Sequence, residues 1–93
     1  VLQSMACGLP GLISVADGAS EFVRDGENGY LLRDPGSPAG LRAAMHHALA
    51  LAPEARAQMG RTARATVLPL TWEAHVASWE ALCQRVLVER SLA

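Results

Sequence analysis

The sequence predicts an α/β fold, with strands in the part spanning residues 1–36 and only helices in the part spanning residues 37–93. Two observations lead to this prediction. Short apolar runs without polar alternation, bounded by turn residues, are typical of strands covered on both faces. Longer segments with apolar residues at steps of three and four are typical of helices. Because strands and helices alternate, we expect a parallel sheet.

The first part contains two predicted strands, Gly11–Val15 and Tyr30–Leu32, which we expect to lie side by side or across one intervening strand. A helix over Val1–Cys7 precedes them, since Gly8 and Pro10 commonly follow the end of a helix. Between the strands we expect a turn, a short helix and a second turn, over Ala16–Ala19, Ser20–Asp25 (capped by Ser20) and Gly26–Gly29. Two strands do not form a stable sheet alone, so further strands are expected from outside this sequence.

The second part contains three predicted helices. Ser37 followed by Pro38 is an N-cap and a first-turn proline, Pro53 ends that helix and opens the next, and Thr71 caps the last. We expect Gly60 to break the middle helix. On the first of the three, the residues expected to pack inward are Leu41, Ala44, Met45, Ala48, Leu49 and Ala52.

The last predicted helix carries an apolar stripe of more than four turns, which has to lie against something large. Its members are Trp72, Val76, Trp79, Cys83, Val86 and Arg90. Apolar helix faces are most often core, and the two cysteines, Cys7 and Cys83, are expected to be small buried residues. An unpaired sheet edge and the Trp72/Trp79 face would allow the chain to self-associate.

Charge and spacing exclude several functions. The net charge of −1, without a basic cluster, argues against a nucleic acid as partner. No apolar run is long enough to span a membrane, and we expect a cytoplasmic protein, or one peripheral at the inner membrane when intact. The cysteines lie far apart, and His46, His47 and His75 lack the spacing of metal ligands, so no metal site is expected.

Several segments resemble a known family in order and spacing. Residues 2–10, LQSMACGLP, resemble the "LEAMACGLP" element of the large retaining glycosyltransferase family, and Glu21 falls at the glutamate of its "GGIPE" element. Residues 22–32, FVRDGENGYLL, resemble its "EVVRDGENGLLV", and residues 71–73, TWE, resemble the opening of its last helix. The chain is therefore similar to the glycosyl transferases of group 1 over almost its whole length.

The resemblance implies an architecture of two Rossmann-like domains, the GT-B type, with the donor bound in the cleft between them. Residues 1–93 would be part of the C-terminal, nucleotide-sugar-binding domain, and the N-terminal acceptor domain would be absent. The implied reaction moves a sugar from a nucleoside diphosphate sugar to a hydroxyl acceptor with retention, without a cofactor. In the family two glutamates separated by seven residues face the donor; the first would lie eight residues before Gln3. We therefore expect no catalytic residue in this chain, and no activity from it alone.

Gln3 takes the position of the second glutamate, which in the family lies near the donor ribose. A carboxylate accepts from two ribose hydroxyls, whereas an amide accepts from one and donates to another, so binding by Gln3 would be weaker. Asp17, where the family has Gly, and Gly18 are the expected edge of the donor cleft, since they follow the carboxyl end of a strand. A carboxylate there would repel a diphosphate.

Other interpretations of the sequence remain open. A degenerate, non-catalytic relative that serves as a binding or scaffold module would also carry Gln3 and Asp17. A non-hydrolysing sugar epimerase shares the architecture but lacks the "MACGLP" run. Glu21 is expected to favour the start of a short helix rather than to act in catalysis, and Gly18, Gly26 and Gly29 are expected to be turn glycines, since they match no phosphate-binding fingerprint.

Overall fold

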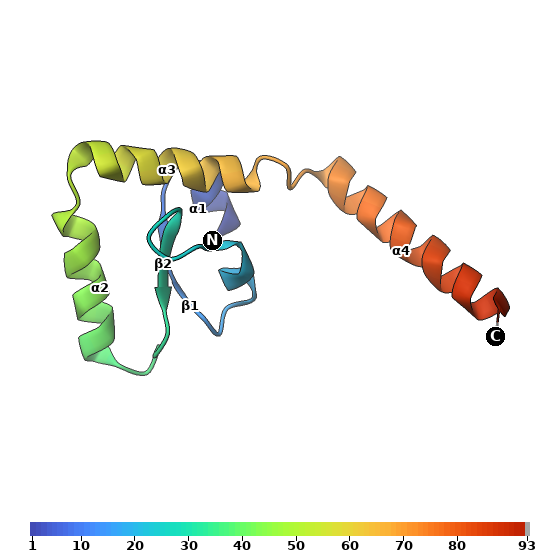
Figure 1. Ribbon diagram of the computed structural model, residues 1–93, viewed down its shortest axis with the longest axis horizontal. Coiled ribbons are helices and arrows are strands. Elements are labelled where there is room, and N and C mark those ends of the chain that lie inside the picture. Colours follow the sequence, from blue (N-terminus) through green and yellow to red (C-terminus); the bar gives the residue numbers. More distant parts are fainter. Residues whose placement is uncertain (93) are drawn as a thin grey trace.

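The computed structural model describes residues 1–92 and contains two strands, four α-helices and one short 3₁₀-helix (Figure 1). In chain order these are α1 (Leu2–Ala6), β1 (Gly11–Ser14), η1 (Gly18–Phe22), β2 (Gly29–Leu32), α2 (Pro38–Ala50), α3 (Pro53–Val67) and α4 (Trp72–Leu92). Helices and strands therefore alternate at first, and the chain is helical from Pro38 onward.

The strands β1 and β2 form a parallel pair, with Gly11 opposite Gly29 and Ser14 opposite Leu32. This confirms the predicted side-by-side parallel arrangement and the mixed α/β class. A two-stranded sheet is too small to identify a Rossmann-like domain, so that part of the fold stays a prediction.

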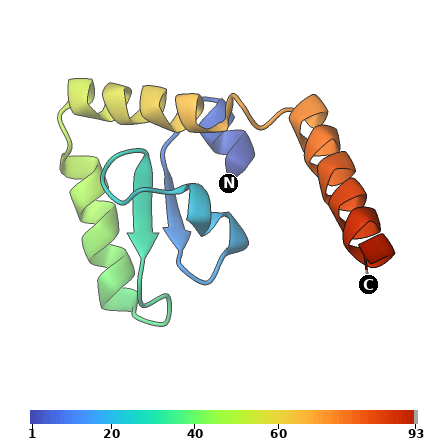
Figure 2. The ribbon, with the colours of Figure 1, turned by 45° about the vertical axis from the view of Figure 1, so that its right-hand side comes forward.

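Helices cover both faces of the small sheet. On one face, Ile13 and Val23 pack with residues of α1 and α3 in a buried core that includes Met5, Ala63 and Val67. On the other face, the ring of Tyr30 meets His47 of α2 edge-on, with 5.5 Å between the ring centroids. Figures 1 and 2 show α3 lying across α1 and α2 running beside β2. This layering explains why the strand sequences are mainly apolar.

The predicted helix ends are confirmed where a specific residue terminates or caps the helix. Gly8 has a positive φ of 76°, and its N–H and that of Leu9 donate to the carbonyls of Met5 and Ser4 at 2.9 and 3.0 Å, which closes α1 in a Schellman motif. The hydroxyls of Ser37 and Thr71 each accept a hydrogen bond, at 3.1 Å, from the backbone N–H three residues ahead.

Two local predictions are wrong. The short helix between the strands is capped by Asp17 rather than Ser20: the Asp17 carboxylate accepts from the Ala19 N–H at 2.8 Å, and the Ser20 hydroxyl donates to the Val15 carbonyl at 3.3 Å. The other correction concerns Gly60, which does not break α3: the helix continues through this residue. Gly60 is buried against the backbone of Gly8, and a Cβ at Gly60 would collide with the Gly8 carbonyl oxygen. The missing side chain therefore allows α1 and α3 to approach closely.

The prediction that the large apolar residues of α2 pack inward is also wrong. Only Ala44 and Ala48 are half-buried, because α2 lies against β2 with its small residues and with His47. The large apolar side chains, Leu41, Met45 and Leu49, are exposed and line an open groove. Cys7 and Cys83 are exposed as well, contrary to expectation, because α1 packs through Met5 and α4 has no neighbour over Cys83.

The helix α4 has no buried residue and extends away from the other elements (Figures 1 and 2). Trp72 is 81% exposed and Trp79 is 56% exposed, so the apolar stripe is present but uncovered. Within residues 1–92, no helix combines the length and apolar content that a membrane span requires.

Candidate functional site

The predicted ribose-binding residue, Gln3, lies in the first turn of α1 and is exposed. The Schellman turn reverses the chain between α1 and β1, so the start of α1 points toward the carboxyl ends of the strands (Figure 2). Ligands of open α/β sheets bind at that edge. Gln3 therefore lies on an accessible surface, in the first turn of a helix whose start points toward that edge.

The predicted cleft edge, Asp17 and Gly18, follows the carboxyl end of β1. The Asp17 N–H donates to the Ser14 carbonyl at 3.0 Å, and its carboxylate is held by the Ala19 N–H at 2.8 Å. Gly18 has open space around the position of a Cβ and no positive φ, so neither packing nor backbone conformation requires glycine there. The carboxylate charge is fixed at the tip of this loop.

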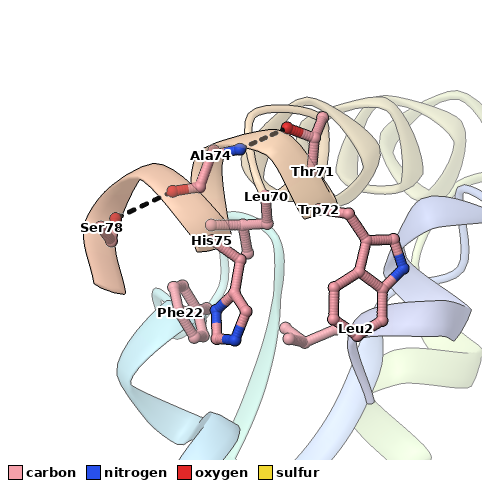
Figure 3. A pocket seen from close by; sticks show the side chains of 8 residues that line it. All are labelled: Leu2, Phe22, Leu70, Thr71, Trp72, Ala74, His75 and Ser78. Carbon is pink, nitrogen blue, oxygen red and sulfur yellow. Dashed lines mark hydrogen bonds between the residues drawn. The ribbon is translucent and has the colours of Figure 1, made fainter. Parts of the chain in front are cut away.

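Asp17 and Gly18 are adjacent in the chain, and the structure does not link either of them to Gln3. Among the described residues, no hydrogen bond joins Gln3 to either residue. The connection is indirect: Leu2, beside Gln3, and Phe22, the last residue of η1, line one open cavity of about 400 Å³ (Figure 3). The start of α1 and the end of the Asp17-capped helix are therefore neighbours.

That cavity is mostly apolar and also involves the start of α4. The side chains of Leu2, Phe22 and Trp72 lie around His75 in Figure 3. The imidazole Nε2 of His75 accepts from the indole N–H of Trp79 at 3.1 Å, which engages one of its two ring nitrogens. The two hydroxyls of the lining are engaged with the backbone of Ala74. The cavity is therefore better suited to an apolar group than to a diphosphate.

The most constrained polar residue, Asn28, was expected only as part of a turn. It is fully buried, its amide oxygen accepts from the Arg24 N–H at 2.7 Å, and its amide nitrogen donates to the Phe22 carbonyl at 2.9 Å and to the Thr66 hydroxyl at 3.0 Å. Asn28 thus ties the end of η1 and the loop before β2 to α3. The sequence indicates only a turn at this position, because Asn28 lies within the DGENG segment.

A second polar contact holds the same loop. The carboxylate of Asp25 accepts from the backbone N–H of Leu31 at 3.0 Å, and the Gly26 N–H donates to the Gly29 carbonyl at 2.8 Å. At the end of α1, the guanidinium of Arg64 donates to the Ala6 carbonyl at 2.6 Å. The first two bonds hold the loop before β2, and the Arg64 bond ties α1 to α3.

The remaining candidate residues are one glutamate and three histidines, and only His46 and His47, on α2, lie apart from this region. Glu21 lies in the first turn of η1, where a carboxylate is favoured by the helix dipole. His46 lies on the α2 groove, His47 contacts Tyr30, and His75 lies on α4. Within the part of the chain that the structure describes, no three His, Cys, Asp or Glu side chains come together as a metal site.

Comparison with known proteins identifies the family. The profile of the family described as "Glycosyl transferases group 1" matches residues 1–66, which include α1, both strands, α2 and nearly all of α3. Neither the curated proteins nor the solved structures gave a match. Since the profile covers more than half of the chain, the chain belongs to the glycosyl transferases of group 1.

Proposed function

We propose that the chain is the donor-binding part, within the C-terminal domain, of a retaining glycosyltransferase that moves a sugar from a nucleoside diphosphate sugar to a hydroxyl acceptor. The family match over residues 1–66 is the observation that carries this proposal. We assign no catalytic residue to this chain. The acceptor and the catalytic groups would come from other parts of the intact protein.

The exposed amide of Gln3 supports a role in holding the donor. A vicinal diol offers two donors and two acceptors, and a side-chain amide can accept from one hydroxyl while donating to the other. Gln3 is on the surface, in the first turn of a helix fixed to α3 by the Arg64 contact and by the close approach of Gly8 to Gly60. The donor ribose would therefore meet a positioned amide rather than a mobile loop.

Asp17 favours a second candidate, a non-catalytic member that serves as a binding or scaffold module. Its carboxylate occupies the loop at the carboxyl end of β1 and is held there by the Ala19 N–H at 2.8 Å. A fixed negative charge close to a diphosphate weakens binding, because like charges repel strongly where water is excluded. The two candidates differ in whether the intact protein binds a nucleoside diphosphate.

The test is titration calorimetry of the intact protein with a nucleoside diphosphate and with its 2′,3′-dideoxy analogue. We expect Gln3→Leu to lose about 1–3 kcal/mol of binding free energy, the cost of leaving polar partners unsatisfied, which is about tenfold to a hundredfold in affinity. Gln3→Glu should keep or improve binding, since a carboxylate accepts from both hydroxyls.

The dideoxy analogue is the matched control, because it lacks the hydroxyls that Gln3 would contact. Its affinity should be the same for the unchanged protein and for Gln3→Leu. If Gln3→Leu binds both ligands as the unchanged protein does, Gln3 has no role at the ribose. If the intact protein binds neither ligand, the non-catalytic candidate replaces the transferase.

A further inference from the structure

One face of α3 packs on α1, and its members contribute in different ways. They recur at steps of three and four residues and are Gly60, Ala63, Arg64 and Val67. Ala63 and Val67 share the buried core with Met5. Gly60 lies against the backbone of Gly8. These contacts bring the two helices close together, but apolar attraction is not directional, so it does not by itself fix how α1 is turned about its axis.

Arg64 is the polar member of this face and makes a directional contact. Its guanidinium donates to the carbonyl of Ala6 at 2.6 Å. The backbone N–H groups that follow α1 donate to the carbonyls of Gln3, Ser4 and Met5, so Arg64 satisfies a carbonyl that the turn leaves over. Among the described residues, this is the one side-chain hydrogen bond between α1 and α3, and Arg64 forms no ion pair there. A cation at the carbonyl end of a helix is also favoured by the helix dipole.

We propose that Arg64 is a positioning residue for the donor, which holds the amide of Gln3 in the orientation that binds the ribose diol. This inference rests on the proposed role of Gln3 at the donor. Gln3 and Ala6 are less than one turn apart in the same helix, so they move as one body. An amide must direct its oxygen at one hydroxyl and its N–H at the other, and a hydrogen bond weakens steeply as its angle departs from linear.

The place of Arg64 favours this indirect role over direct contact with the diphosphate. The guanidinium bonds the carbonyl end of α1, whereas the start of α1 points toward the carboxyl ends of the strands (Figure 2). Ligands of open α/β sheets bind at that edge. Arg64 and the donor would therefore act on opposite ends of the helix, with Gln3 at the end that faces the donor.

The experiment is titration calorimetry of the intact protein with adenosine, guanosine and uridine diphosphate, each compared with its 2′,3′-dideoxy analogue. Arg64→Met removes the hydrogen-bond donor but keeps most of the apolar stem. We expect it to lower the affinity for the diol ligand between about twofold and tenfold, the size of coupling found within one hydrogen-bonded network. Its affinity for the dideoxy analogue should not change, because that ligand lacks the hydroxyls that Gln3 would contact.

Two further variants separate positioning from a general structural role. In the Gln3→Leu background, Arg64→Met should cause no further loss of affinity, because no amide is left to be positioned. Arg64→Lys should recover part of the affinity for the diol ligand, since an ammonium also donates to a carbonyl but lacks the planar fork of the guanidinium. A variant that merely loosened the fold would weaken the binding of both ligands in both backgrounds.

Arg61→Met is the matched control, because it makes the same charge change on the same helix. The guanidinium of Arg61 bonds Gln58 within α3, at 2.7 Å, and not α1. This variant should bind both ligands as the unchanged protein does. An equal loss for both ligands in Arg64→Met, no loss at all, or a full further loss in the Gln3→Leu background would overturn the positioning role alone. If the unchanged protein does not prefer the diol ligand, the proposed role of Gln3 fails, and this proposal fails with it.

Discussion

Residues 1–67 and the helix α4 differ in how they are stabilised. Every buried residue of the described chain lies between Met5 and Val67, where α1 and α3 enclose one face of the sheet. The helix α4 is longer than any other element but has no buried residue. The family profile ends at residue 66, close to the same boundary. The first region has its own core, whereas none of the described elements covers the second.

This difference shows that an apolar pattern predicts a contact surface but does not identify what fills it. The stripe of α4 and the core residues of α3 have the same helical spacing. Of these two helices, only α3 packs against another helix of the described chain, because Gly60 and Ala63 are small enough to let α1 approach. Trp72 and Trp79 are large, and no element within residues 1–92 buries them.

The largest effect should follow loss of the buried amide that ties the first region together. Asn28→Ala removes three hydrogen bonds and leaves the Arg24 N–H and the Phe22 carbonyl to find new partners. We expect a loss of about 3 kcal/mol in the free energy of unfolding, at about 1 kcal/mol for each bond, measured by urea denaturation. Thr66→Val, which removes one of the three bonds, should lose about a third as much. Equal losses in the two variants would show that the bond to α3 alone matters.

A smaller effect should follow from separating α1 and α3. Gly60→Ala places a Cβ against the Gly8 carbonyl, and we expect a loss of about 2 kcal/mol from overpacking. Gly18→Ala is the control, since nothing lies near its Cβ, and it should change stability by less than about 0.5 kcal/mol. If α1 does not pack on α3 in solution, Gly60→Ala should instead stabilise the chain, because alanine is the better helix former.

Local signals predicted much of the fold. Gly8, Ser37 and Thr71 act within one helical turn, so their effects do not depend on distant residues. The parallel pairing of the strands followed from the alternation of strands and helices along the chain. The errors arose where a distant contact decided the outcome. Gly60 lies within α3 and serves the close approach of Gly8 rather than a helix break, and Leu41 and Met45 are exposed because α2 packs through its alanines and His47.

The candidate site was predictable only in part. The resemblance pointed to Gln3 and Asp17, and the structure places both on the surface, with Asp17 at the carboxyl end of β1. It did not point to Asn28, because a buried amide and a turn residue look alike in sequence. Its three hydrogen-bond partners come from residues 22, 24 and 66, and the last of these is distant in the chain.

Hydrogen–deuterium exchange of the full chain at several protein concentrations tests the division between the two regions most directly. We predict that amides of β1, β2 and α3 exchange slowly and at the same rates at every concentration, because their packing is internal. Amides of α4 should exchange faster than those of α3, because none of the described elements covers α4. Exchange of α4 as slow as that of α3 would contradict this division.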